Sequence, residues 1–135
     1  MQVKELNLLS NELSILYIED DLELRKQNKE FLKNFFKKIV LAKDGEEALW
    51  YFRNEHFDIV IADINIPKID GISMLKKMKE LKNDQKFLIT TVYKKEELYE
   101  SMKLLEIKHF LTKPILTKQL LKKLEEVVKE ATFNS

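Results

Sequence analysis

The stretch DIVIADINIPKIDGISML, residues 58–75, contains the pattern that decides the fold. It begins with Asp58–Ala62, a short apolar run with no alternation of polar residues, and continues directly into Asp63. A continuous apolar run of this length is typical of a strand that a parallel sheet buries on both faces. After the turn residues Asp70 and Gly71, apolar side chains recur at helical spacing. The stretch therefore predicts a strand, a loop and a helix, in that order.

The same alternation of short apolar runs and helical patterns extends along the chain. The other four runs are Ser14–Ile18, Lys38–Ala42, Phe87–Thr91 and His109–Thr112. A stretch with helical apolar periodicity follows each run, and the last of these has the most regular spacing. Five strand–helix units predict an α/β fold, a doubly wound five-stranded parallel sheet flanked by five helices.

Composition excludes several classes of function. The 135-residue chain fits one domain, and its 24 basic and 23 acidic residues leave a net charge of only +1. This balance argues against direct nucleic acid binding and against binding to an anionic membrane. The chain has no cysteine, which excludes disulfides and thiol nucleophiles. No apolar stretch is long enough for a membrane span or a signal peptide, so we expect a cytoplasmic protein.

Side chains that could carry chemistry follow four of the predicted strands. They are Glu19, Asp20, Asp63, Thr91 and Lys113. In open α/β sheets, ligands bind beyond the carboxyl ends of the strands. Clustered carboxylates repel one another unless a cation neutralises them, and oxygen ligands suit Mg²⁺ or Mn²⁺. A carboxylate beside such an ion can attack phosphorus, while a lysine and a hydroxyl bind the phosphoryl oxygens.

Four motifs, in order, resemble the receiver domain of two-component response regulators of the chemotaxis-regulator type. They are ILYIEDD (15–21), AKDGEEAL (42–49), DIVIADINIPKIDGISML (58–75) and FLTKP (110–114). The resemblance implies the flavodoxin-like strand order 2-1-3-4-5. It also implies a receiver domain over residues 13–130, preceded by an N-terminal extension at 1–12 and followed by a short tail at 131–135.

The resemblance also implies a role for each residue at the strand ends. Asp63 matches the phosphoacceptor, and the implied Mg²⁺ ligands are Glu19, Asp20, Asp63 and the backbone carbonyl of Asn65. The implied switch hydroxyl is Thr91, the phosphate-binding lysine is Lys113 and the rotating switch aromatic is Phe110. A cis bond between Lys113 and Pro114 is implied as well.

Other interpretations are open at several of these positions. Asp21 fits an N-cap of the first helix better than a metal ligand, and Asp70 fits a turn. Phe110 fits a core aromatic as well as a switch. Val92 stands where the family commonly has a small residue, and a branched side chain there could narrow access to the phosphoryl group. Tyr93 occupies a position that tunes dephosphorylation in the family.

The expected function is a signalling switch and not an enzyme. A sensor histidine kinase or phosphotransfer protein would donate to Asp63, and an output partner or effector domain of unknown identity would read the result. One alternative is a degenerate receiver that acts only as a binding module, which the complete set of site residues argues against. Another is a Mg²⁺-dependent aspartyl phosphatase, a class that needs a second Asp where this chain has Asn65.

Overall fold

A five-stranded parallel sheet forms the centre of the protein, in the order β2-β1-β3-β4-β5. The computed structural model describes residues 6, 10–65, 70–92 and 95–133. The strands are β1 (Ser14–Ile18), β2 (Lys38–Ala42), β3 (Ile59–Asp63), β4 (Lys86–Thr91) and β5 (Phe110–Thr112). The helices are α2 (Leu22–Leu32), α3 (Gly45–Asn54), α4 (Gly71–Leu81), α5 (Lys95–Leu104) and α6 (Thr117–Phe133). The predicted doubly wound fold and its strand order are confirmed.

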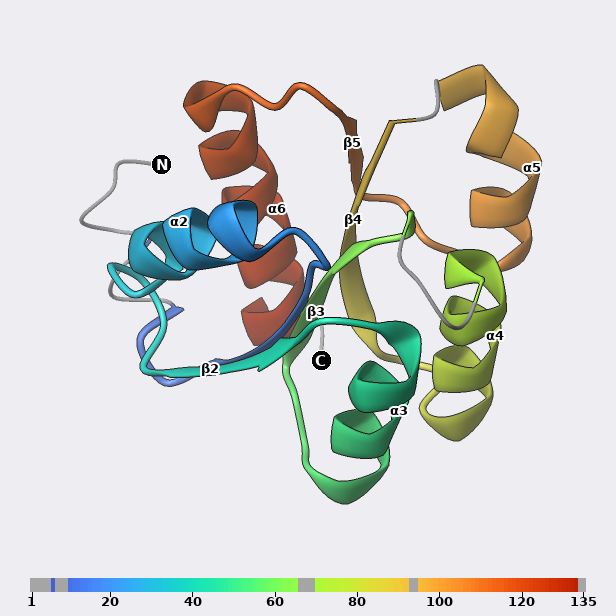
Figure 1. Ribbon diagram of the computed structural model, residues 1–135, viewed down its shortest axis with the longest axis horizontal. Coiled ribbons are helices and arrows are strands. Elements are labelled where there is room, and N and C mark those ends of the chain that lie inside the picture. Colours follow the sequence, from blue (N-terminus) through green and yellow to red (C-terminus); the bar gives the residue numbers. More distant parts are fainter. Residues whose placement is uncertain (1–5, 7–9, 66–69, 93–94, 134–135) are drawn as a thin grey trace.

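The helices cover the sheet in two layers. Helices α2 and α6 lie on one face, and α3, α4 and α5 lie on the other (Figure 1). Successive side chains of a strand point to opposite faces, so each central strand supplies both layers. Leu16 and Ile18 of β1 pack in the α3–α5 layer, whereas Ile15 and Tyr17 pack in the α2–α6 layer. Every residue of β1 and β3 is buried, as their unbroken apolar runs predict.

Three strands differ by one residue from the predicted runs at their starts, and β4 begins one residue early, at Lys86. Strand β3 begins at Ile59, because the side chain of Asp58 turns to the neighbouring strand. Its Oδ2 accepts a hydrogen bond from the backbone N–H of Ser14 at 2.8 Å. Strand β5 begins at Phe110, one residue after His109.

Aspartates begin three of the helices. The carboxylates of Asp21, Asp44 and Asp70 accept hydrogen bonds from the backbone N–H groups of Leu24, Glu47 and Ser73 at 3.0, 2.8 and 3.2 Å. Each bond satisfies a donor at a helix start that has no partner within the helix. Asp21 is therefore the N-cap of α2, as expected.

Gly71 begins α4 in a place that leaves no room for a side chain. A Cβ atom there would lie 2.6 Å from Cα and 2.7 Å from the carbonyl carbon of Ile64, and closer still to its carbonyl oxygen. These are backbone atoms of the residue that follows Asp63, so they cannot rotate away. The absence of a side chain at Gly71 thus lets α4 start close to the end of β3.

Residues near both ends of the chain also pack on the α2–α6 layer. Leu6 is buried there, and the hydroxyl of Ser10 lies 2.6 Å from the carbonyl oxygen of Leu6 and 2.7 Å from that of Phe35. Helix α6 continues to Phe133. The domain boundaries at 12/13 and 130/131 stay predictions. Within the described residues, no helix has the length and apolar character that crossing a membrane requires.

We predict that Asp58 contributes to stability in a pH-dependent way. Burial opposes its charged form, but the Ser14 N–H, His56 and the Ser14 hydroxyl outweigh burial and lower the pKa of Asp58 below 3.8. A lowered folded-state pKa gives stability that is present above the unfolded pKa and lost as the pH falls through the folded one. Asp58→Ala should therefore lower the free energy of unfolding by about 1–2 kcal/mol at pH 7. The loss should be smaller at pH 3, because part of the stabilisation by the charged carboxylate is already gone there.

Chemical denaturation at both pH values measures this effect. The matched variant Asp58→Asn keeps an oxygen acceptor for Ser14 and loses the charge, so its loss at pH 7 should be smaller than that of Asp58→Ala. Equal losses at pH 7 and pH 3 for Asp58→Ala would contradict the prediction.

Candidate functional site

Three carboxylates meet at the carboxyl edge of the sheet. Glu19 and Asp20 follow β1, and Asp63 is the last residue of β3. Carboxylate oxygens of the three lie within 4.8 Å of one another. Glu19 and Asp63 are each only 2% exposed, whereas Asp20 is exposed to solvent. The parallel order places the ends of β1 and β3 next to each other, which brings the acids together.

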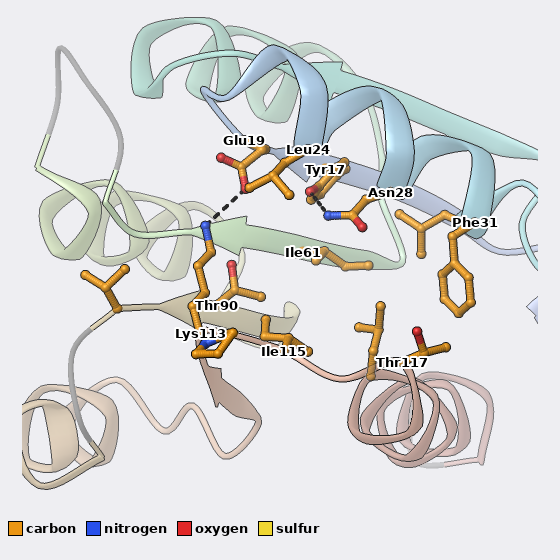
Figure 2. A pocket seen from close by; sticks show the side chains of 14 residues that line it. Tyr17, Glu19, Leu24, Asn28, Phe31, Ile61, Thr90, Lys113, Ile115 and Thr117 are labelled. Atoms are coloured by element: carbon orange, nitrogen blue, oxygen red, sulfur yellow. Dashed lines mark hydrogen bonds and ion pairs between the residues drawn. The ribbon is translucent and has the colours of Figure 1, made fainter.

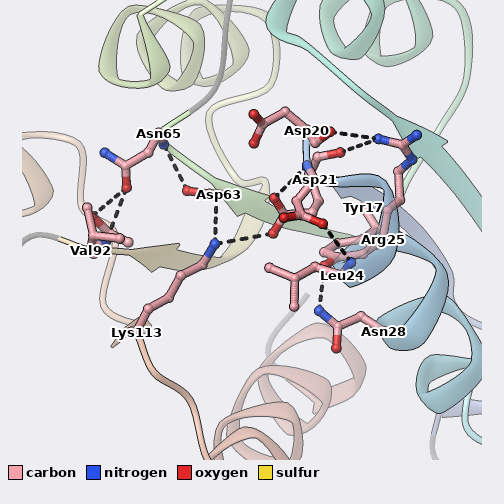
Figure 3. Close-up of polar contacts among 12 residues, drawn as sticks. Tyr17, Asp20, Asp21, Leu24, Arg25, Asn28, Asp63, Asn65, Val92 and Lys113 are labelled. Carbon is pink, nitrogen blue, oxygen red and sulfur yellow. Dashed lines mark hydrogen bonds and ion pairs between the residues drawn. The ribbon is translucent and has the colours of Figure 1, made fainter.

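Lys113 joins two of these acids. Its ammonium Nζ lies 2.8 Å from Asp63 Oδ2 and 3.3 Å from Glu19 Oε1 (Figure 3). Burial alone would lower the pKa of Lys113, but the hydrogen bond and charge of Asp63, together with Glu19, raise it. Lys113 is therefore a fixed cation at the site. The peptide bond from Lys113 to Pro114 is cis, as the resemblance implies.

The acids are in excess of the positive charge at this edge. Burial raises the pKa of Glu19, and the nearby charge of Asp63 adds to that rise against the opposing effects of the Asp21 N–H and Lys113. Three carboxylates face one ammonium, and Asp20 makes no side-chain hydrogen bond or ion pair within the described part of the chain. An oxygen-rich site with surplus negative charge fits a divalent cation such as Mg²⁺.

Thr91 lies on the other side of Asp63, at the end of β4. It is fully buried, and its hydroxyl donates to the side-chain Oδ1 of Asn65 at 3.2 Å. The same oxygen accepts a hydrogen bond from the backbone N–H of Val92 at 3.1 Å (Figure 3). The backbone N–H of Asn65 donates to Asp63 Oδ1 at 2.8 Å. Asn65 thus connects the acid that ends β3 to the hydroxyl that ends β4.

Phe110 does not belong to this cluster. It is half-buried at the start of β5 and packs against the layer formed by α3, α4 and α5. This position is compatible with a core aromatic and with a switch. Val92 is 60% exposed, so most of its side chain faces solvent. Tyr93 lies outside the described residues.

Arg25 is a supporting residue that the sequence did not reveal. Its Nη1 donates to the carbonyl oxygens of Glu19 and Asp20 at 2.8 and 3.3 Å (Figure 3). The guanidinium therefore holds the backbone that presents two of the acids. The only sequence signal for this contact is that a helix with three basic residues, Arg25, Lys26 and Lys29, follows the acids. This pattern is too common to be specific.

Comparison with known proteins identifies the same type of domain. The family model for the response regulator receiver domain matches residues 15–125. The chemotaxis protein CheY of Treponema pallidum is 30% identical over 118 residues, covering 85% of this chain and 82% of that protein. The chain also matches longer proteins: the transcriptional regulatory protein ZraR of Escherichia coli is 32% identical over 63% of this chain, but only 19% of ZraR is covered.

Solved structures give the same result. A CheY-like receiver domain protein from Methanospirillum hungatei superimposes with a TM-score of 0.83 at 25% identity, covering 92% of this chain and all of that one. A complex of CheX, CheY, BeF₃ and Mg²⁺ from Borrelia burgdorferi contains a chain 29% identical to this one. Its TM-score is 0.79, with 87% of this chain and 90% of that chain covered.

We predict opposite effects of Asp20→Asn on metal binding and on the metal-free protein. Asp20 repels Glu19 and Asp63 without a compensating bond within the described residues, so its neutralisation should raise the melting temperature in EDTA by about 2 °C. The same change removes the negative charge of one carboxylate from the cation site, so it should weaken Mg²⁺ binding. Thermal melts with and without Mg²⁺ measure both effects.

Asp21→Asn is the matched control, because Asn can also serve as an N-cap and Asp21 is outside the acid cluster. It should leave Mg²⁺ binding unchanged. A fall in the EDTA melting temperature of Asp20→Asn would show that Asp20 stabilises the metal-free site and would refute the prediction.

Proposed function

Because the chain belongs to the response regulator receiver family, we propose that Asp63 accepts a phosphoryl group and thereby switches a partner-binding surface. The observation that carries the proposal is the bridge of Lys113 Nζ to Asp63 and Glu19 beside the exposed carboxylate of Asp20. Asp63 is held in place by Lys113 and by the N–H of Asn65. Receiver domains generally act as signalling modules and not as enzymes, and we assign that role here.

The proposed donor is the phosphohistidine of a sensor histidine kinase or of a phosphotransfer protein. A carboxylate oxygen of Asp63 attacks the phosphorus, the P–N bond breaks, and the leaving imidazole takes up a proton. The product on this chain is an acyl phosphate at Asp63. Lys113 then pairs with a phosphoryl oxygen, because its ammonium already lies against the reacting carboxylate.

Mg²⁺ is the cofactor that the donor set suits best. Glu19, Asp20 and Asp63 would hold it, with the backbone carbonyl of Asn65 as a further ligand. When bound, the ion neutralises negative charge that gathers on the phosphoryl oxygens. The surplus of carboxylates over cations at this edge supports the assignment.

The proposed switch starts at Asn65. Its Oδ1 accepts hydrogen bonds from Thr91 and Val92, the two groups best placed to bind a phosphoryl group on Asp63. Both donors must leave Asn65 before they can bind phosphoryl oxygens. Movement of Thr91 would allow Phe110 to turn and would change the surface formed by α5, β5 and α6. Phosphorylation of this kind biases a two-state element.

The output partner or effector domain is not identified by this chain. The Borrelia burgdorferi structure pairs a CheY with CheX, which supports a protein as the reader of the switched surface. The near-neutral charge supports a receiver that does not itself bind nucleic acid or a membrane, and we place it in the cytoplasm. A degenerate binding module would not need Lys113 on Asp63, and a phosphatase of the aspartyl type would need an acid at Asn65.

We predict a single phosphoryl adduct on Asp63 when the protein is treated with acetyl phosphate and Mg²⁺. The Asp63 carboxylate attacks, the P–O bond to acetate breaks, and intact mass spectrometry detects the product. EDTA should abolish the adduct, and so should Asp63→Asn.

Asp70→Asn is the matched control, since Asp70 is an exposed N-cap on the neighbouring helix. Its adduct should equal that of the unchanged protein. An undiminished adduct on Asp63→Asn would refute the assignment of the phosphoacceptor.

We also predict that Asn65→Ala binds beryllofluoride more tightly in the presence of Mg²⁺. The change removes the oxygen that holds the Thr91 hydroxyl and the Val92 N–H, so neither bond has to break before these groups bind the phosphoryl mimic. A net hydrogen bond of about 1 kcal/mol corresponds to roughly a fivefold gain in affinity. Titration followed by the Val92 amide resonance measures it, with the remote Asn34→Ala as the control. Unchanged or weaker binding would contradict the role of Asn65.

A further inference from the structure

A cavity of about 650 Å³ lies between α2 and α6, beneath the loop from β5 to α6. The two helices that line it lie on the face of the sheet opposite α3, α4 and α5 (Figure 1). Protein interiors are normally packed with few voids larger than a water molecule. Small-molecule sites typically have volumes of ~300–1,000 Å³. The size of this hollow is therefore that of a ligand site.

The walls of the cavity are mostly apolar and incompletely covered. Leu24 and Phe31 line it from α2, and Ile115 and Leu120 line it from the opposite side. Leu24 is 37% exposed, and the other three are half-buried. Figure 2 shows Leu24, Phe31 and Ile115 around this space. An apolar ligand would cover them and gain the free energy of removing that surface from water.

Buried polar groups form part of the lining. Thr90 is 7% exposed and lines the cavity. Tyr17 is 3% exposed, and its hydroxyl accepts a hydrogen bond from Asn28 Nδ2 at 2.7 Å (Figure 2). A phenol that accepts one bond still has its own proton to donate. Burial raises the pKa of Tyr17 far above its ordinary value, so this hydroxyl stays a neutral donor.

The charged side chains of the lining are already paired. They are Lys113 and Glu19, which lie 3.3 Å apart, and Lys113 also contacts Asp63. A charged ligand in the cavity would have to compete with these ion pairs or remain uncompensated in an apolar space, which is costly. The lining thus favours a ligand without charge.

We propose that this cavity binds an uncharged small molecule with an apolar body and a hydrogen-bond acceptor that the Tyr17 and Thr90 hydroxyls recognise. The proposal does not depend on phosphorylation, since it needs neither Asp63 nor a cation, although Glu19, Val92 and Lys113 belong to both linings. The cavity is adjacent to the proposed phosphorylation chemistry, because Thr90 precedes Thr91 on β4 and Lys113 borders both sites. A bound molecule would therefore contact residues next to the switch.

The test is a titration of the unphosphorylated protein in EDTA with 2-naphthamide, followed by amide resonances in two-dimensional NMR. 2-Naphthamide is uncharged and carries a carbonyl acceptor, and 2-naphthoate is its charged counterpart. We expect saturable shifts that centre on Tyr17, Thr90 and Thr117, with much weaker binding of 2-naphthoate. Tyr17→Phe and Thr90→Val should each weaken binding by about fivefold, the effect of one net hydrogen bond.

A pair of filling variants controls for binding elsewhere. Thr117 lines the cavity at the start of α6, whereas its neighbour Leu116 is 65% exposed and outside the lining. Thr117→Phe should abolish the shifts and Leu116→Phe should preserve them, with thermal melts confirming that both variants fold. Absence of saturable shifts, equal binding of 2-naphthoate, or binding that survives Thr117→Phe would each overturn the proposal. Because neither Mg²⁺ nor a phosphodonor is present, these results are independent of phosphorylation at Asp63.

Discussion

The ion pair between Lys113 and Asp63 is the interaction on which the arrangement at the carboxyl edge depends. Asp63 is 2% exposed, and an unpaired carboxylate at that depth would be costly. The ammonium at 2.8 Å offsets part of that cost, and it reaches Glu19 as well. The pair also joins β3 to the end of β5, two strands that are not neighbours in the sheet. The Lys113 ammonium thus joins two of the carboxylates, and the three acids together still carry more negative charge than Lys113 can neutralise.

Three aspartates outside the acid cluster show what makes the site distinctive, because they cap helices. The carboxylates of Asp21 and Asp44 accept hydrogen bonds from backbone N–H groups at helix starts. Asp63 accepts a local N–H too, from Asn65, but its second oxygen faces Lys113. The site is therefore not defined by acids after strands, which recur along the chain. It is defined by acids that meet a buried cation across the sheet edge.

The sequence was sufficient to predict the fold and to bring most of the candidate site residues to one edge of the sheet, while their roles stay predictions. Unbroken apolar runs reveal buried parallel strands, and the order of the runs places Glu19, Asp63, Thr91 and Lys113 at one edge. The sequence did not predict contacts that depend on how the helices pack against the sheet and against one another. Arg25 beneath the acids is one example. His109 is another: it is 9% exposed, with Nε2 2.9 Å from Glu130 and Nδ1 3.4 Å from Glu126 of α6. Nothing local in the sequence fixes the rotation of α6 that creates this contact.

The alternation of side chains along β4 connects the two faces of the sheet. Thr91 points to Asn65 and the phosphorylation edge, whereas Thr90 lines the cavity beneath α2 and α6. Consecutive strand residues share a peptide unit, so a shift of one hydroxyl displaces the backbone that carries the other. The carbonyl oxygen of Thr91 accepts a hydrogen bond from the Lys113 N–H at 2.7 Å, which extends this coupling to β5. A ligand that holds Thr90 in place would therefore oppose the movement of Thr91, and by reciprocity that movement would weaken the ligand's binding.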